Sequence, residues 1–405
     1  MHSRGFVLRY YIQQPRSLIM RILTVLTYYR PHTSGLTIYA ERLARAFAKQ
    51  GHQVTVMTTQ YDKSLPLEEL MDGVRVIRIP VAMRISKGVI APTFGLVATR
   101  EVLHHDVVQL HLPQFDAPGV ALRARLFGKP VVLTYHCDLF LPPIIFNRFV
   151  NLVIQFQNNM AALLADHIVT YTQDYADNSS YLSRYRRKLT PLLPPVILPP
   201  TEPAAVESFA VTYQTRQRRP VIGMVTRFAA EKGVEILLEA LPAVLEKYPK
   251  AQVLFAGQYQ NVIGEQEYAD RLMPLIIKYE EMGCWKFLGN LSQQQLAAFY
   301  PNMDVLVVPS LNSTEAFGLV QVEAMLNNIP CVASALPGVR RPVEMHAMGK
   351  VVPVGDPASL SAALLEIFDR KDEYHCDTLE LAHLYHPDTV ASEYEKLFKK
   401  LLRAN

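Results

Sequence analysis

Apolar and polar residues follow two patterns that alternate along the chain. Short apolar runs, such as residues 21–27, are followed by stretches in which apolar residues recur every three or four positions, such as residues 38–50. The first pattern is typical of buried strands and the second of amphipathic helices. Gly51 ends the first helical stretch, and residues 52–58 form the next apolar run. Strands that alternate with helices predict a parallel sheet with helices on both faces.

The pattern also assigns the two faces of the helix expected at residues 38–50. Leu43, Ala44 and Phe47 share one face, which we expect to be buried. The basic residues are expected to point away from that face: Arg42, Arg45 and Lys49. Further strands of the first half are predicted at residues 74–80, 106–112, 130–136 and 167–172.

A proline-rich segment at residues 189–205 interrupts the alternation. Proline suppresses helices and central strands, so this segment is expected to be a semi-rigid connector. The pattern then begins again, with strands and helices predicted at residues 220–228, 233–248, 252–257, 304–310, 330–336 and 356–368. We therefore expect two α/β domains, at residues 20–200 and 201–385, and a C-terminal helix at residues 386–405 that crosses back to the first domain.

The start of the chain does not fit the pattern. Residues 1–19 carry Arg4, Arg9 and Arg16 but no apolar core of the length that a signal peptide has. We expect the fold to start at Met20, and the preceding residues to be a disordered tail or an artefact of the assigned start.

No run of 18 apolar residues suggests a membrane-spanning helix. The nearest candidate, residues 142–167, contains a polar stripe at helical spacing: Asn147, Asn151, Gln155 and Asn158. This pattern predicts an amphipathic helix. Its apolar face favours packing in the core over shallow docking on a membrane.

Charge is distributed unevenly between the two halves. Residues 1–200 contain 22 basic and 12 acidic residues, a net charge of +10, whereas the remainder has a net charge of −6. A basic first half suggests an anionic partner, either a membrane surface or a phosphate-bearing acceptor, unless the charges only solvate that domain. The four cysteines have no paired spacing, which is typical of a reduced, cytoplasmic protein.

Ligands of open parallel sheets bind beyond the carboxyl ends of the strands. In the first domain, Ser34 and Gly35 lie between a strand and a helix, where backbone N–H groups can meet an anion. An ordinary turn explains this pair equally well. In the second domain, Arg227 and Lys232 follow a strand and can hold a diphosphate. The alternative is two solvated charges, one of them paired with Glu231.

Glu315 and Glu323 stand in apolar surroundings near the expected start of a helix at Phe317 or Gly318. A buried carboxylate needs a partner, and the hydroxyl pairs of a ribose or hexose are suitable donors. Glu315 has an alternative role as an acid near the helix N-terminus. The alternative for Glu323 is that it is simply an exposed residue of the helix.

His136 ends a predicted strand, and its neighbour Asp138 is placed to orient it. A metal site at His104, His105 and His111 is disfavoured, because strand alternation scatters these side chains and no carboxylate joins them at ligand spacing.

Three segments together resemble one family. The segment "TRFAAEKG" is followed by "PSLNSTEAFGLVQVEAM" and "PCVASALPGVRRPV", in which seven residues separate the two glutamates. This combination resembles the retaining glycosyltransferases of family 4. The resemblance implies the GT-B fold, with two Rossmann-like doubly wound α/β domains facing an interdomain cleft. It covers nearly the whole chain from Met20.

The resemblance also implies roles by position. Arg227 and Lys232 would bind the donor diphosphate, and Glu323 the ribose hydroxyls. Glu315, with the backbone at Phe317, Gly318 and Leu319, would bind the transferred sugar. Gly35 would let the first loop approach the diphosphate, and His136 would face the sugar. The chain departs from the family in two places, with Ser34 where a first glycine is usual and prolines in place of an Asn-Gly turn before the linker.

The expected function is transfer of a hexose from a nucleotide-diphosphate sugar to a hydroxyl acceptor with retention, without a metal or another cofactor. The acceptor suggested by the basic first half is a lipid or lipid-linked glycan, used in cell-envelope or exopolysaccharide synthesis. We expect a cytoplasmic enzyme with peripheral membrane contact through the first domain and no nucleic-acid partner. Alternatives are a GT-B epimerase or phosphorylase, and a non-catalytic protein that binds nucleotide sugars.

Overall fold

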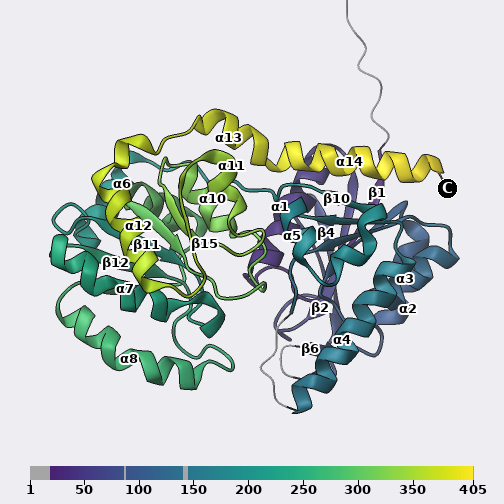
Figure 1. Cartoon of the computed structure of the whole chain (residues 1–405). Coiled ribbons are helices and arrows are strands. Elements are labelled where there is room, and N and C mark those ends of the chain that lie inside the picture. Colours follow the sequence, from purple (N-terminus) through teal and green to yellow (C-terminus); the bar gives the residue numbers. More distant parts are fainter. Residues whose placement is uncertain (1–18, 86–87, 140–144, 405) are drawn as a thin grey trace, which may run out of the picture.

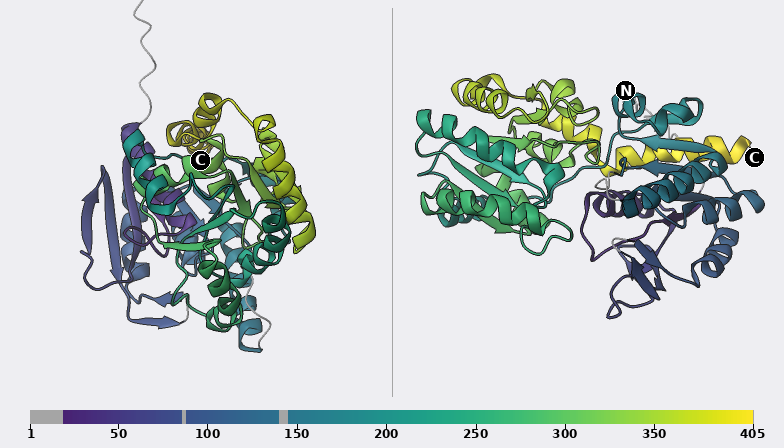
Figure 2. Two further views of the ribbon diagram at one scale, coloured as in Figure 1. Left: turned by 90° about the vertical axis from the view of Figure 1, so that its left-hand side faces the viewer. Right: turned by 60° about the horizontal axis from the view of Figure 1, so that its bottom comes forward.

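The computed structural model describes residues 19–85, 88–139 and 145–404, and it consists of two lobes side by side (Figure 1). The expectation of a disordered tail or start-site artefact at residues 1–19 therefore falls almost entirely outside the described residues. Each lobe is built on a parallel sheet flanked by helices (Figures 1 and 2). This confirms the prediction of two doubly wound α/β units.

The first lobe contains an eight-stranded sheet in the order β10-β9-β8-β7-β1-β2-β4-β3. Its strands are β1 Arg21–Val25, β2 Gln53–Gln60, β3 Glu68–Met71, β4 Val74–Pro80, β7 Val107–Leu112, β8 Val131–Tyr135, β9 His167–Thr170 and β10 Leu189–Pro191. All neighbours are parallel except β3, which pairs antiparallel with β4. A separate short hairpin joins β5 Met83–Ile85 and β6 Gly88–Ile90.

Helices of the first lobe cover the sheet. They are α1 Gly35–Lys49, α2 Phe94–His104, α3 Ala117–Leu126, α4 Ile145–Leu164 and α5 Gln173–Asn178, followed by the 3₁₀ helix η1 Leu182–Lys188. The strand interiors are buried on both faces and mostly apolar, with Gln109, His111 and Thr134 as buried polar residues in β7 and β8.

The second lobe contains a six-stranded, all-parallel sheet in the order β13-β12-β11-β14-β15-β16. Its strands are β11 Val221–Val225, β12 Gln252–Ala256, β13 Trp285–Gly289, β14 Val305–Val308, β15 Cys331–Ser334 and β16 Gly349–Val352. The helices and 3₁₀ turns are η2 Ala230–Lys232, α7 Val234–Lys247, α8 Gln266–Glu281, α9 Gln293–Phe299, η3 Tyr300–Asn302, α10 Leu319–Met325, α11 Arg341–His346, α12 Pro357–Asp369 and η4 Lys371–Glu373.

The proline-rich connector begins as the edge strand β10 and continues to α6 Pro203–Tyr213 without further helix or strand. An edge position suits this proline-containing strand, because proline has no backbone N–H group to donate to a second neighbouring strand.

Two helices end the chain, α13 Thr378–Tyr385 and α14 Pro387–Ala404. Both views show α14 leaving the second lobe and lying along the first (Figures 1 and 2). There it packs on α1, with the Tyr394 hydroxyl 2.8 Å from that of Tyr39 and the ring of Phe398 5.7 Å from that of Phe47.

The structure corrects two assignments of helix faces. Arg42 is buried rather than directed to solvent, whereas Arg45 and Lys49 are exposed as predicted. In α4, Asn158 is buried while Leu152 and Phe156 are exposed, so the apolar residues of this helix do not all pack in the core. The side chains at residues 145–149 are outside the described set. Among the described residues, no helix is both long and apolar enough to span a bilayer.

Candidate functional site

Two loops of the second lobe meet because β11 and β14 are neighbours in the sheet. Arg227 and Lys232 follow β11, and Glu315 follows β14. The Lys232 ammonium donates to Glu315 Oε2 at 2.7 Å, and the Gly318 N–H donates to Glu315 Oε1 at 3.0 Å. The predicted cation and the first predicted glutamate therefore form one half-buried cluster at the carboxyl edge of the sheet.

Arg227 lies in the same loop but has a different acidic partner. Its guanidinium donates to Glu231, four residues further along the chain. This is the ion pair that the sequence offered as an alternative to diphosphate binding. The Arg227 side chain is 37% exposed, so an incoming anion can reach its guanidinium and replace Glu231 as its partner.

Gly318 gives the Glu315 loop its conformation. It has φ of +77°, and an added Cβ would lie 2.7 Å from Nε2 of Gln321. That same Gln321 amide donates to the carbonyls of Phe317 and Val339 at 2.8 and 2.9 Å. The Phe317 ring is buried beneath the loop, and Leu319 begins α10. These contacts fix the backbone next to Glu315.

Glu323 is separate from this cluster. It is buried in α10, and its Oε2 accepts a bond from the hydroxyl of Tyr300 at 2.8 Å. Its Oε1 accepts from Arg42 of the first lobe at 2.9 Å. The alternative of an exposed helix residue is therefore wrong. In this arrangement both carboxylate oxygens already have protein partners.

The first-lobe loop at Gly35 opens α1. The Ser34 side chain caps this helix by accepting from the Thr37 N–H at 3.2 Å. Gly35 is exposed, and an added Cβ would meet no atom within 4 Å. The protein itself therefore does not require glycine at this position.

His136 follows β8 and is buried in a chain of polar groups. Its Nδ1 lies 2.5 Å from the Tyr171 hydroxyl, and its Nε2 lies 2.8 Å from Nδ1 of His111. Asp138 does not orient it, as the sequence suggested. The Asp138 carboxylate instead accepts bonds from Tyr135 and Ser179 at 2.6 and 3.0 Å. Tyr171 takes that role because β9 lies beside β8.

Burial controls the protonation of both imidazoles. It lowers the pKa of His111 to about 3, and burial together with the neighbouring His111 lowers the pKa of His136 well below its usual range. Both rings are therefore neutral at pH 7. Among the described residues, His111 Nε2 has no hydrogen-bond partner, so it is the open end of the Tyr171–His136–His111 chain.

Several contacts bring the two lobes together at this place. Cys137 is half-buried, and desolvation raises the pKa of its thiol to about 12. The thiol interacts electrostatically with Lys232, Glu315 and Arg227. The rings of Tyr171 and Phe317 are 5.8 Å apart. Further contacts join Tyr175 to the Ser313 carbonyl at 3.0 Å, and Asp174 to the Arg340 guanidinium and the Gly338 N–H.

Of the predicted residues, the structure thus brings together Arg227, Lys232, Glu315, Phe317, Gly318 and Leu319. His136 is buried in the first lobe and is linked to this group through Tyr171, whose hydroxyl it bonds and whose ring lies 5.8 Å from that of Phe317. Glu323 is set apart with Arg42, and among the described residues no atom lies within 4 Å of the position that a Cβ would take at Gly35. Sequence reasoning missed the partners Arg42, Tyr300, His111 and Tyr171. The alternation along β7 and β8 could have paired His111 with His136, but no local signal pointed to Arg42.

Comparison with known proteins divides the chain in the same way. Residues 33–190 match the family model described as Glycosyltransferase Family 4. Residues 207–376 match the model described as Glycosyl transferases group 1. Together the two models span both lobes.

Curated relatives match over most of their length. The phosphatidyl-myo-inositol mannosyltransferase of Mycobacterium leprae is 26% identical over 390 residues, which cover 94% of this chain and 96% of that protein. The 2-deoxystreptamine N-acetyl-D-glucosaminyltransferase of Streptomyces fradiae is 27% identical over 352 residues, or 81% of each chain.

Solved structures share the fold. HepE of Anabaena in complex with UDP has a TM-score of 0.73 at 17% identity, covering 94% of this chain and 100% of that one. Sucrose-phosphate synthase from Thermosynechococcus elongatus has a TM-score of 0.73 at 21% identity, covering 95% and 100%. Two parallel α/β sheets in this arrangement have the GT-B fold of these structures, and the two matching family models show that the protein is a glycosyltransferase. Within that class, the chain belongs to glycosyltransferase family 4, also described as group 1. The resemblance drawn from the sequence is confirmed.

Proposed function

We propose that the enzyme transfers a hexose from a nucleoside diphosphate sugar to a hydroxyl group of a lipid or lipid-linked acceptor, with retention at the anomeric carbon. The observation that carries this proposal is the cluster of Lys232, Glu315 and Gly318 beside Arg227, in a chain of family 4. It supplies cations for a diphosphate next to a carboxylate for sugar hydroxyls.

The diphosphate is assigned to Arg227 and Lys232. Each cation is now held by an acid, Glu231 or Glu315, which keeps the side chains ordered without a ligand. A diphosphate replaces Glu231 at Arg227 and gains a bidentate partner. Lys232 can serve both the phosphate and Glu315, because an ammonium has three donors.

The hexose is assigned to Glu315 and to the backbone at Phe317, Gly318 and Leu319. Its other side faces the first lobe, where we assign His136 to the sugar. Both nitrogens of His136 are bonded to protein, so one of these two bonds has to be exchanged when His136 binds the sugar. We assign the nucleotide ribose to Glu323. The diphosphate is proposed to approach the first-lobe loop at Gly35.

In the reaction, the bond between the anomeric carbon and the phosphate oxygen breaks while the acceptor oxygen bonds to the same face of that carbon. The acceptor proton passes to the leaving phosphate oxygen. Arg227 and Lys232 stabilise the charge that grows on this diphosphate, so catalysis consists of positioning and charge stabilisation. No metal or other cofactor takes part in the proposed step.

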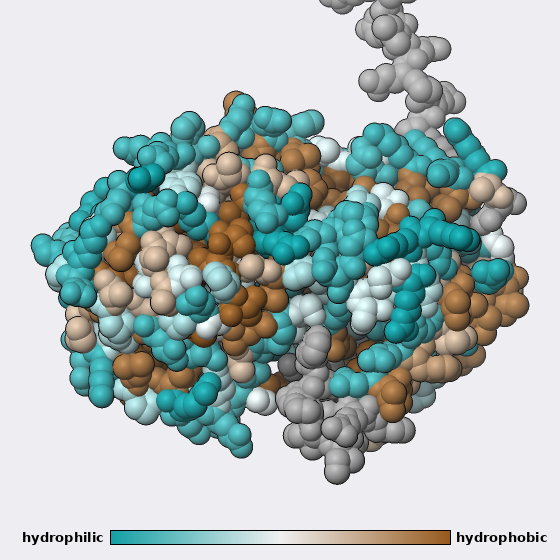
Figure 3. Space-filling view, viewed as in Figure 1, coloured by the Kyte–Doolittle hydropathy of each residue, from teal (hydrophilic) through white to brown (hydrophobic). Residues whose placement is uncertain are grey.

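Three observations support a lipid acceptor and peripheral contact with a membrane on the cytoplasmic side. One relative is named as a phosphatidyl-myo-inositol mannosyltransferase. Residues 1–200 carry a net charge of +10. Large apolar side chains are exposed on neighbouring helices of the first lobe, and Figure 3 shows apolar surface over α2 and α3. These side chains are Leu96, Leu103, Leu122, Leu126, Leu152, Phe156 and Leu163.

The test is a screen of UDP- and GDP-hexoses that follows released nucleotide with and without vesicles containing phosphatidylinositol. We expect release only when an acceptor is added, and an α-linked product from an α-linked donor. Release of free nucleotide with an epimerised sugar and no acceptor would favour an epimerase. Sugar phosphate formed from phosphate and a glycan would favour a phosphorylase, and nucleotide-sugar binding with no turnover would favour a binding protein.

A further inference from the structure

Arg42 is a buried first-lobe cation whose partners all lie outside its own lobe's sheet and helices. Its guanidinium donates to the carbonyls of Pro195 and Ile197 in the connector at 3.2 and 2.9 Å. It also donates to Gln293 at the start of α9 at 3.2 Å, and to Glu323 of α10 at 2.9 Å. One side chain thus joins α1, the connector between the lobes, and two helices of the second lobe.

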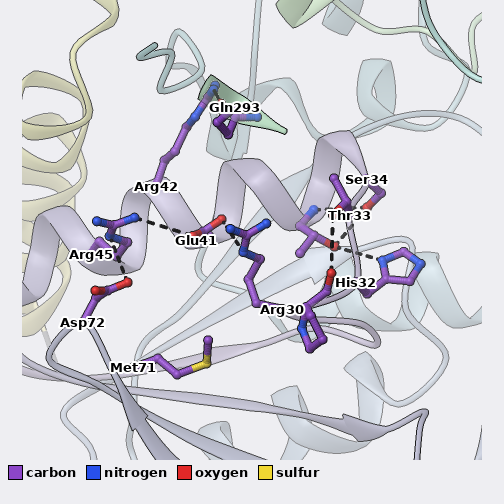
Figure 4. A network of polar contacts seen from close by, with 12 residues as sticks. Arg30, His32, Thr33, Ser34, Glu41, Arg42, Arg45, Met71, Asp72 and Gln293 are labelled. Atoms are coloured by element: carbon purple, nitrogen blue, oxygen red, sulfur yellow. Dashed lines mark hydrogen bonds and ion pairs between the residues drawn. The ribbon is translucent and has the colours of Figure 1, made fainter. Parts of the chain in front are cut away.

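The neighbouring charges of α1 behave differently. Glu41 pairs with Arg30 and Arg45, and Arg45 also reaches Asp72, in a network near the surface. Figure 4 shows Arg42 leaving α1 away from this network, towards Gln293. Only 7% of the Arg42 side chain is exposed, compared with 54% for Arg45. A buried charge is costly unless it is paired, so the contacts of Arg42 are a specific arrangement.

The connector needs these contacts because of its prolines. Proline lacks an N–H group, so a proline-rich segment has carbonyl acceptors but few donors with which to form regular structure. Arg42 supplies donors to two of its carbonyls. It therefore holds the connector that replaces the Asn-Gly turn usual in the family.

The Glu323 carboxylate has remaining capacity for a ligand. Two carboxylate oxygens offer about four acceptor positions, and Arg42 and Tyr300 occupy one on each oxygen. Burial and the nearby Glu323 raise the pKa of Tyr300 well above its usual range, so its hydroxyl remains a donor at neutral pH. Each carboxylate oxygen of Glu323 therefore has one acceptor position left. These two positions match the two adjacent hydroxyls of a ribose.

We propose that Arg42 is a positioning residue for the donor: with Tyr300, it holds the Glu323 carboxylate in the orientation that accepts the two ribose hydroxyls, and it ties that carboxylate to the connector between the lobes. The inference rests on the proposed assignment of Glu323 to the ribose. Arg42 touches neither the sugar nor the reacting atoms in this scheme, so its loss affects donor binding more than turnover.

The test compares Arg42→Met, Arg42→Lys and the matched control Arg45→Met, using calorimetric titration with UDP and GDP and steady-state kinetics. We expect Arg42→Met to weaken nucleotide binding about 10- to 100-fold. The donor KM should rise accordingly, with a smaller change in kcat. Arg42→Lys should recover part of the affinity, and Arg45→Met should bind like the wild type.

A double-mutant cycle with Glu323→Gln separates positioning from general damage to the fold. If Arg42 acts through Glu323, Arg42→Met adds no further loss in the Glu323→Gln background. Losses that add, or wild-type affinity in Arg42→Met, would overturn the inference. The double variant leaves no unpaired buried charge, so it gives a measurement even if Arg42→Met alone does not fold. Wild-type binding by both Glu323→Gln and Arg227→Ala would count instead against the proposed function.

Discussion

Arg227 and Glu231 form a partly buried pair that exists before any donor binds. If the diphosphate replaces Glu231, the bond formed by Arg227 strengthens as negative charge develops on the leaving group. We predict that Arg227→Ala lowers kcat by about 10²- to 10³-fold, equivalent to about 3–4 kcal/mol in the barrier. The measurement is initial rate against donor concentration at saturating acceptor.

A matched control for this substitution is Arg271→Ala. Arg271 is 63% exposed and lies 3.7 Å from Glu235 on another part of the second lobe. Its removal should leave kcat and KM within a factor of about two, because exposed pairs contribute at most about 1 kcal/mol. Equal turnover by Arg227→Ala and the wild type would remove Arg227 from the site.

The buried His111 predicts a specific loss of stability in acid. Its pKa is about 3 in the folded protein, compared with a reference value of 6.5. Below pH 6.5 the unfolded chain therefore takes up a proton that the folded protein excludes, so the free energy of unfolding falls as the pH falls. The slope is up to about 1.4 kcal/mol per pH unit from this residue. Urea unfolding between pH 7 and 5 should show a shallower fall in His111→Asn, and an unchanged slope would contradict the prediction.

Among the site residues, sequence reasoning succeeded where the chemistry is local. Arg227, Lys232 and Glu315 each follow a predicted strand, and the rule that neighbouring parallel strands end at one edge brings them together. Arg42 was placed wrongly because a helical pattern assigns a charged residue to the solvent side by default. Its burial depends on a carboxylate 281 positions further along the chain, which periodicity cannot indicate.

At the scale of the elements, two glycines near the site have opposite requirements. Gly233 starts α7 with φ of +66°, and an added Cβ would lie 2.1 Å from the Pro309 carbonyl. Gly35 begins α1 with room around it. We predict that Gly233→Ala lowers the free energy of unfolding by more than about 1 kcal/mol. Gly35→Ala should leave it unchanged or raise it by up to about 1 kcal/mol, because alanine favours helices.

The two variants should also differ in donor binding. If the diphosphate approaches the loop at Gly35, the methyl group of Gly35→Ala occupies space that the ligand needs. Nucleotide affinity should then fall although stability does not. Thermal unfolding with and without nucleotide measures both quantities, and unchanged affinity in Gly35→Ala would argue against an approach at this loop.

The long, buried elements were the predictable ones. The central strands of both sheets agree with the predicted apolar runs, because burial on both faces leaves a mostly apolar sequence. The antiparallel edge strand β3 and the β5–β6 hairpin were not predicted, since they are short and partly exposed. In α4 the helical periodicity was predicted correctly, but the buried face was not. Leu152 and Phe156 are residue types that usually pack in a core, yet both are exposed here.

For the whole molecule, the exposed apolar helices predict an orientation on a membrane. Leu152 and Phe156 are one turn apart on α4, and no acidic residue interrupts that helix. We predict that the protein floats with vesicles of anionic lipid at low salt, driven by the net charge of the first half and by insertion of these side chains.

Replacing both side chains by serine should reduce flotation without reducing stability, because both are more than 60% exposed. Leu379→Ser is a control, since Leu379 is 82% exposed on the second lobe. Absence of flotation by the wild type at low salt would contradict the membrane contact.

The two-lobed architecture could be predicted from the repeated pattern of strands and helices and from the proline-rich connector. The contacts between lobes did not, because they join residues such as Asp174 and Arg340 that only the folded chain brings together.

The position of α14 affects the order in which the protein can mature on the ribosome. Domains ordinarily fold during synthesis from the N-terminus onwards. Here the buried Tyr39 and Phe47 of the first lobe each lack one of their partners until Tyr394 and Phe398 have been made. The part of the enzyme that is translated first is therefore completed last, after its second lobe has left the exit tunnel. Until then, the nascent first lobe exposes the face of α1 that α14 covers in the complete fold.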